Sequence, residues 1–154
     1  RRAGTPNMMG VVGMGKAAEL ARVEMPQRTE RLLKLKKAVM DHLGTIDKIV
    51  INGHPEKSLP GLVSFSVEYI EGESMMMMLD EEGVSISTRS ACASGSLRTS
   101  HVLIATGIDH ATAQGTLVFS YGIDITMEDI DRAFSSLKKS VAFLRNMSPL
   151  YKKG

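Results

Sequence analysis

The sequence has little of several residue types, and each shortage excludes a class of protein. Only one of the 154 residues is a cysteine, and none is tryptophan. A single cysteine cannot form an internal disulfide and favours a reducing compartment, so we expect a cytoplasmic protein. No apolar run approaches the roughly 20 residues of a membrane span, and we expect neither a signal peptide nor a membrane anchor. The net charge of +2 is too small to predict nucleic acid as a partner.

What the sequence does contain is typical of a globular protein. Hydrophobic residues make up 43% of the chain and charged residues 23%. A chain of this length predicts a single domain, residues 1–154, with one core. Because the chain begins with Arg1, we expect it to be a processed product or a piece of a longer protein.

The hydrophobic pattern predicts a mixture of helices and short strands. Residues 8–24 have helical spacing, with a narrow face of glycine and alanine that another element could approach. Pro26 suits the first turn of a helix, so we expect a second helix from there to about Leu43. Thr126 is the predicted N-cap of the final helix. Further helices are expected over 72–82 and 100–106, a turn over 111–114, and strands over 48–52, 62–67 and 116–121. This order predicts an α+β fold with a short, mostly antiparallel sheet covered by helices.

The only cysteine, Cys92, lies in a run of small and hydroxylated residues, Ser87 to Ser96. Such a composition predicts an exposed loop. Arg89 and Arg98 flank the cysteine and would favour its thiolate, which is the nucleophilic form. The alternative is a buried, structural cysteine, since free cysteine is often buried. The loop composition favours a reactive thiol.

Three other motifs do not predict chemistry. The stretch from Gly10 to Lys16 has the spacing of a phosphate-binding loop, but Ala17 follows where a magnesium-binding hydroxyl is needed, and no strand precedes it. The four histidines show no metal-ligand spacing, so we expect no metal site. The four methionines at 75–78 would point in different directions on a helix, which favours core packing over a soft-metal site.

The residues around Cys92 resemble the active-site loop of cysteine desulfurases of the NifS/IscS type, which belong to the class-V aminotransferases. The matching segments keep the family's order: Arg2–Asn7, Gly72–Ser74, Ser90–Ser96, Ser100–Leu103, Phe119–Gly122 and Ser148–Leu150. The resemblance covers nearly the whole chain and corresponds to the carboxy-terminal portion of a longer enzyme. It implies the small domain of the aspartate-aminotransferase-like fold, with residues 1–25 leading toward an absent large domain and residues 26–154 forming the small α+β domain.

The resemblance implies an activity and roles for two residues. Enzymes of this family use pyridoxal phosphate to remove sulfur from L-cysteine, which leaves alanine. Cys92 matches the nucleophile that becomes a persulfide. Thr5 matches a hydroxyl that reaches the cofactor phosphate of the other subunit in the family's homodimer. The implied partners are L-cysteine and a sulfur acceptor, such as an iron–sulfur scaffold protein, and selenocysteine remains open as a substrate.

The chain departs from the family pattern in two ways. The lysine that anchors pyridoxal phosphate belongs to the large domain and is absent. Val118 stands where the family carries an arginine that binds the substrate carboxylate, which is among the stronger contacts available for recognition. A second hypothesis is therefore a non-catalytic persulfide carrier or interaction module that retains the Cys92 loop.

Overall fold

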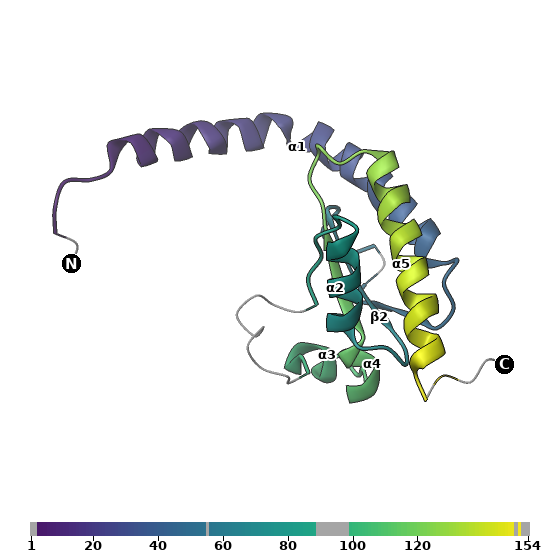
Figure 1. Cartoon of the computed structure of the whole chain (residues 1–154). Helices are drawn as coiled ribbons and strands as arrows, with labels where there is room; N and C mark the ends of the chain where they lie inside the picture. The colour runs from purple at the N-terminus through teal and green to yellow at the C-terminus, as the bar shows by residue number, and fades with distance from the viewer. Residues whose placement is uncertain (1–2, 55, 89–98, 150, 152–154) are drawn as a thin grey trace.

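The computed structural model describes residues 3–54, 56–88, 99–149 and 151. The sheet contains β1 (Ile49–Asn52), β2 (Leu62–Val67) and β3 (Thr116–Ser120), paired antiparallel in the order β1-β2-β3. The helices are α1 (Met8–Leu43), α2 (Gly72–Glu81), α3 (His101–Ala105), α4 (His110–Gln114) and α5 (Met127–Met147). Figure 1 shows the sheet flanked by the helices, with the first part of α1 extending away from them. The predicted α+β fold is confirmed.

The core lies on one face of this sheet. Side chains alternate along a strand, and in β2 the residues Val63, Phe65 and Val67 are all buried on the same face. Phe119 of β3 shares this face, and its ring lies 5.3 Å from that of Phe134 on α5. The second part of α1, together with α2 and α5, covers this face. Complete burial of one such side chain contributes about 1.5–3 kcal/mol.

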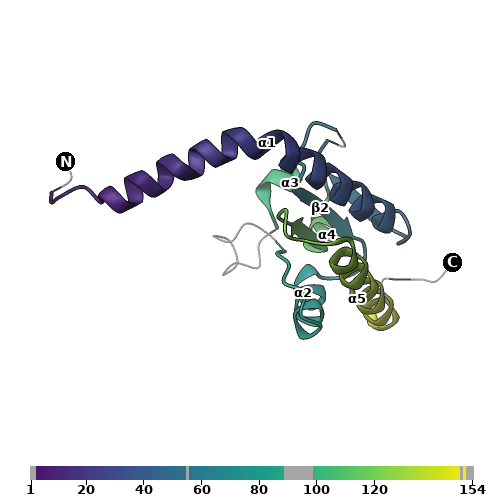
Figure 2. The ribbon, with the colours of Figure 1, turned by 90° about the horizontal axis from the view of Figure 1, so that it is seen from above.

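The prediction that Pro26 begins a second helix was wrong, because α1 continues through this residue. A proline inside a helix removes one backbone hydrogen bond and crowds the carbonyl four residues earlier, which bends the helix. Figures 1 and 2 both show α1 changing direction near its middle. Pro26 is exposed, so the bend disturbs no packing. Glu24 and Arg28 also connect the two sides of Pro26 through a 2.9 Å hydrogen bond from the Arg28 Nε.

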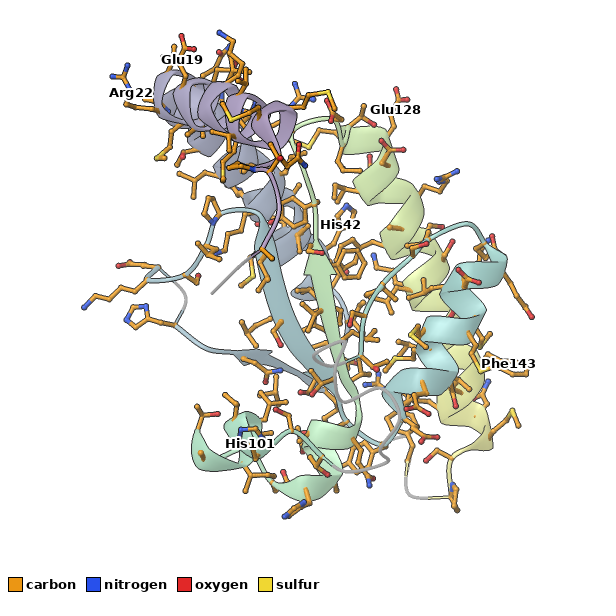
Figure 3. All side chains as sticks on the ribbon, turned by 90° about the vertical axis from the view of Figure 1, so that its left-hand side faces the viewer. Glu19, Arg22, His42, His101, Glu128 and Phe143 are labelled. Atoms are coloured by element: carbon orange, nitrogen blue, oxygen red, sulfur yellow. The ribbon has the colours of Figure 1, made fainter. Side chains whose placement is uncertain are left out.

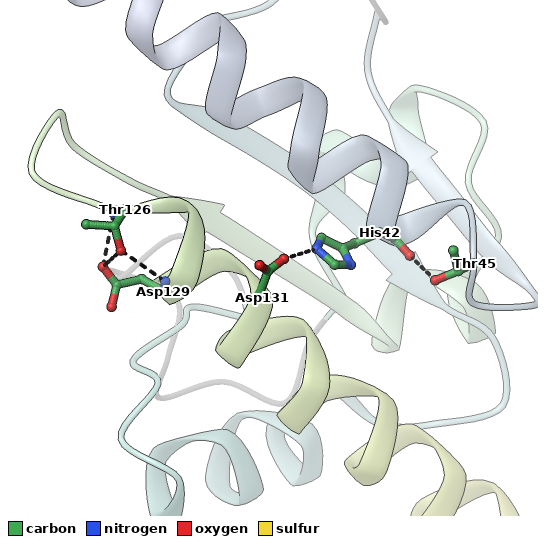
Figure 4. A network of polar contacts seen from close by, with 5 residues as sticks. All are labelled: His42, Thr45, Thr126, Asp129 and Asp131. Atoms are coloured by element: carbon green, nitrogen blue, oxygen red, sulfur yellow. Dashed lines mark hydrogen bonds and ion pairs between the residues drawn. The ribbon is translucent and has the colours of Figure 1, made fainter.

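The predicted N-cap of α5 is confirmed. The Thr126 hydroxyl accepts a hydrogen bond from the Asp129 backbone N–H at 3.1 Å, and the Asp129 carboxylate accepts one from the Thr126 N–H at 3.0 Å (Figure 4). Bonding from the Thr126 hydroxyl, and then from its N–H, holds the pKa of Asp129 below its usual range. This capping box fixes the start of the helix that carries Phe134.

Polar contacts fasten α5 to the rest of the domain at both ends. Near its start, the Nε2 of His42 on α1 lies 2.8 Å from Asp131 (Figure 4), and the His42 ring stacks on Phe134. Near its end, the buried Arg145 donates from Nη2 to the Asp47 carbonyl at 2.6 Å. These contacts hold α5 against α1 and against the turn that precedes β1.

Candidate active site

The segment that contains Cys92 begins at the edge of the sheet. We call residues 89–98 the Cys92 segment. They include Arg89, Cys92 and Arg98 and lie outside the described residues. Before them, Ser87 forms an isolated antiparallel bridge with Val118 of β3: the Val118 N–H donates to the Ser87 carbonyl at 2.6 Å, and the reverse bond is 3.4 Å long. After them, the Thr99 hydroxyl lies 3.4 Å from Nδ1 of His110 on α4. The chain on either side of the Cys92 segment is thus held beside β3 and α4.

The bridge extends a row of side chains that crosses the whole sheet. In register, Asn52 of β1 opposes Ser64 of β2, Ser64 opposes Val118, and Val118 opposes Ser87. Directly opposed residues in antiparallel strands project from the same face. Because Ser64 alternates with core residues along β2, this row lies on the face opposite the core. We call this the second face of the sheet, and its residues on the three strands are Val50, Asn52, Leu62, Ser64, Ser66, Thr116, Val118 and Ser120.

A hydrogen-bond network connects the hydroxyls of the second face. Ser66 is fully buried and Thr116 is 3% exposed, and their hydroxyl oxygens lie 2.7 Å apart. The Asn52 amide donates from Nδ2 to both Ser64 and Ser66 at 3.1 Å, and its Oδ1 accepts from Ser66 at 3.3 Å. Sequence reasoning missed this network. The available signal was the Ser-Phe-Ser alternation at 64–66, which places both serines on one face.

The second face carries no charge. None of its eight residues is ionisable, and Val118, which is half-buried, lies between Ser64 and Ser87. An anion bound here would receive hydrogen bonds but no cation from the three strands. Just beyond β3, the Tyr121 hydroxyl donates to the Pro60 carbonyl at 3.1 Å, and burial raises the pKa of Tyr121 to about 12. Tyr121 is therefore a neutral donor near neutral pH.

The other candidate site residue, Thr5, lies at the opposite end of α1. It is exposed and precedes Asn7, whose side chain accepts a 3.0 Å hydrogen bond from the Gly10 N–H and caps the helix. Figure 1 shows this end of the chain far from the sheet. The structure therefore does not bring Thr5 near the residues that flank the Cys92 segment. The stretch from Gly10 to Lys16 is helical, which agrees with its rejection as a phosphate-binding loop.

Within the described ranges, no three histidine, cysteine, aspartate or glutamate side chains lie close enough together to hold a metal ion. Met75 is fully buried, as expected for core packing, whereas Met77 is 67% exposed and does not pack in the core. The helices in the described part of the chain also include none that is long and apolar enough to cross a membrane.

Comparison with known proteins reveals extensive similarity. The family model "Aminotransferase class-V" matches residues 1–133. Cysteine desulfurase IscS of Methanosarcina thermophila is 47% identical over 150 residues, which cover 97% of this chain and 37% of that protein. Cysteine desulfurase IscS 1 of Archaeoglobus fulgidus is 43% identical over 152 residues, which cover 99% of this chain and 40% of that protein.

Comparison with solved structures also finds a similarity over nearly the whole chain. A solved structure described as a NifS-like protein aligns with 93% of this chain at a TM-score of 0.79 and 28% identity, and the aligned part is 36% of that structure's chain. The chain spans about two fifths of the length of the curated relatives it matches. The similarity therefore covers nearly all of this chain and a minor part of each relative.

Proposed function

The chain belongs to the aminotransferase class-V family, and from this premise we propose that it is the carboxy-terminal domain of a cysteine desulfurase. The observation that carries the proposal is the attachment of the Cys92 segment: it comes shortly after Ser87, which is paired to Val118, beside an uncharged face lined with hydroxyls. The 47% identity with an enzyme named cysteine desulfurase, over 97% of this chain, supports the same reading.

In the proposed reaction, the Cys92 thiol and L-cysteine give L-alanine and a Cys92 persulfide. The carbon–sulfur bond of the substrate breaks, a sulfur–sulfur bond forms on Cys92, and the proton lost from the thiol is balanced by the one gained at the substrate carbon. A thiol on a segment anchored at both sides suits this role, because it must meet the substrate and then deliver sulfur to an acceptor. The proposed acceptor is an iron–sulfur scaffold protein or another sulfur-accepting protein, and the proposed location is the cytoplasm.

Pyridoxal phosphate would supply an electron sink for breaking the carbon–sulfur bond. The described residues do not by themselves form a site for it, since the second face has no lysine to bind it covalently. The proposed contribution of this chain is the Thr5 hydroxyl, which would reach the cofactor phosphate of the partner subunit in a homodimer. Its position at the far end of α1, away from the sheet of its own chain, fits a contact with another subunit. Residues 1–25 would connect to the large domain that carries the lysine, and residues 26–154 would form the small domain.

Val118 favours a second candidate function, a persulfide carrier that accepts sulfur without releasing it from cysteine. A valine cannot form the charged contact with a carboxylate that an arginine forms. A carrier would keep Cys92 and lack the substrate-binding step.

The test incubates the complete polypeptide that carries this chain with L-cysteine and pyridoxal phosphate, and measures alanine release and the intact mass. We expect alanine, together with a mass increase of one sulfur atom that Cys92→Ser abolishes. A persulfide formed only from a separate sulfur donor, with no alanine, would establish the carrier. Absence of both products would refute both functions. In the native protein Cys92 should also react with iodoacetamide, and alkylation only after unfolding would contradict the exposed loop.

A further inference from the structure

Burial determines which hydroxyl on the second face donates each hydrogen bond of the network. The Thr116 hydroxyl is almost fully buried, and the Ser66 oxygen at 2.7 Å is its hydrogen-bond partner. Because a buried hydroxyl proton needs an acceptor, Thr116 donates to Ser66. Ser66 must then donate to the remaining acceptor within reach, the Asn52 Oδ1 at 3.3 Å. The network therefore runs from Thr116 through Ser66 to Asn52.

The network ends at Ser64. With its Oδ1 accepting from Ser66, the Asn52 amide presents Nδ2 to the Ser64 oxygen at 3.1 Å. Ser64 thus accepts a hydrogen bond, and its own proton has no acceptor among the described residues. Ser64 is half-buried and lies directly opposite Val118, in the row that leads to Ser87. Asn52 therefore orients an unused donor in the row that leads to Ser87, with Val118 between the two serines.

We propose that Ser64 donates a hydrogen bond to the α-carboxylate of the amino-acid substrate, and that Asn52 is the residue that positions its hydroxyl. A carboxylate only accepts hydrogen bonds, and a bond to a charged acceptor is stronger than one between neutral groups. The three strands offer no cation on this face, so the oriented hydroxyl is what they can supply to an anion. The proposal rests on the proposed function for the choice of ligand, and it makes Ser64 a specificity-determining residue.

The test measures binding rather than turnover. Isothermal titration calorimetry on the complete polypeptide compares L-alanine, which has an ammonium group and a carboxylate but no thiol to react, with ethylamine, which lacks the carboxylate. We expect Ser64→Ala to weaken L-alanine binding roughly ten-fold, the size of one lost hydrogen bond to a charged group, and to leave ethylamine unchanged. Ser64→Thr keeps the hydroxyl and should bind L-alanine as the parent does. Ser120→Ala removes an exposed hydroxyl from the same face and serves as the matched control.

Equal L-alanine affinity for the parent and Ser64→Ala would overturn the proposal, and so would the absence of measurable L-alanine binding by the parent. An equal loss for L-alanine and ethylamine in Ser64→Ala would likewise reject it, because general damage to the site would explain the change. The proposed function is judged separately by persulfide formation on Cys92. A protein that forms the persulfide but binds L-alanine independently of Ser64 keeps its function and loses this inference.

Discussion

The two halves of α1 are parts of one helix in contrasting environments. In the first half, residues 8–25, every residue from Met8 to Val23 is exposed, including large apolar side chains such as Met9 and Met14. In the second half, residues 27–43, a stripe of Leu35, Val39 and Leu43 is buried against the sheet and α5. The same helix is therefore part of the core at one end and exposed at the other.

Polar contacts differ in the same way. In the second half, the Arg31 Nη2 donates to the Ile125 carbonyl at 3.2 Å, and the Lys36 Nζ donates to the Ser58 hydroxyl at 2.6 Å, so that both side chains reach distant parts of the chain. In the first half, the ion pair between Lys16 and Glu19 stays within the helix. Figure 3 shows Glu19 and Arg22 pointing outward from this part of α1.

The first half of α1 lacks the packing that its second half has within the described residues. Isolated helices are marginal in water, and most helical stability in proteins comes from packing. Glycine inside a helix costs a further ~1 kcal/mol relative to alanine, and the first half contains Gly10, Gly13 and Gly15. An exposed apolar surface with small residues among its large ones is typical of a face that packs against another surface. This agrees with the proposal that residues 1–25 lead to a large domain.

The largest effect should come from truncating an apolar side chain in the buried half. Leu43 is 2% exposed, so Leu43→Ala should lower the free energy of unfolding by about 2–5 kcal/mol through lost burial and a cavity. Leu20, in the first half, is 39% exposed, and Leu20→Ala should change the free energy of unfolding by less than about 0.5 kcal/mol. Urea unfolding followed by circular dichroism measures both. Comparable losses would mean that the first half is part of the cooperative core.

A smaller and local effect is expected from Gly13→Ala in the exposed half. A Cβ atom added at Gly13 meets no atom within 4 Å, so alanine fits without strain. It should stabilise the helix locally by up to ~1 kcal/mol. Because this half packs on nothing in the described chain, protection from amide hydrogen exchange should rise over residues 8–25 while the global free energy of unfolding stays the same. An equal rise in global stability would show that the two halves unfold together.

The sequence predicted those elements whose signals are local. Val63, Phe65 and Val67 alternate within six residues, and the Thr126 cap lies directly before its helix, so neither depends on a distant partner. The bend at Pro26 was misjudged because a proline that begins a helix and one that bends an exposed helix have the same local sequence. Pro26 is exposed, so no neighbouring element of the described chain opposes the bend.

The candidate site was predictable only in part, because its geometry comes from the register of distant strands. Cys92 could be singled out by composition and resemblance. The row from Asn52 through Ser64 and Val118 to Ser87 joins four segments of the chain, and no local pattern gives their alignment. A shift of one residue in the register of β2 would turn Ser64 toward the core and Phe65 away from it. Hydrogen-bond partners of this kind follow from the fold as a whole.

The smallest effect should come from the charges on α1, and it separates burial from electrostatics as the cause of the contrast. Glu30 and Lys34 form a 2.8 Å ion pair whose side chains are about two-thirds exposed. The hydrogen bond from Lys34, and then its charge, hold the pKa of Glu30 below its usual range.

The folded chain therefore binds fewer protons at Glu30 than the unfolded chain does. The small stabilisation from this ion pair is present above the usual pKa of about 4.3 and is lost as the pH falls through the lowered value. Lys34→Met should return the pKa of Glu30, measured by carboxyl carbon NMR, to its usual range and leave the free energy of unfolding near neutral pH almost unchanged. Lys16→Met is the matched change in the first half and should cost equally little. Since both halves carry such exposed pairs, ion pairs within the helix do not explain why only one half packs against the domain. A loss from Lys34→Met as large as that from Leu43→Ala would reverse this conclusion.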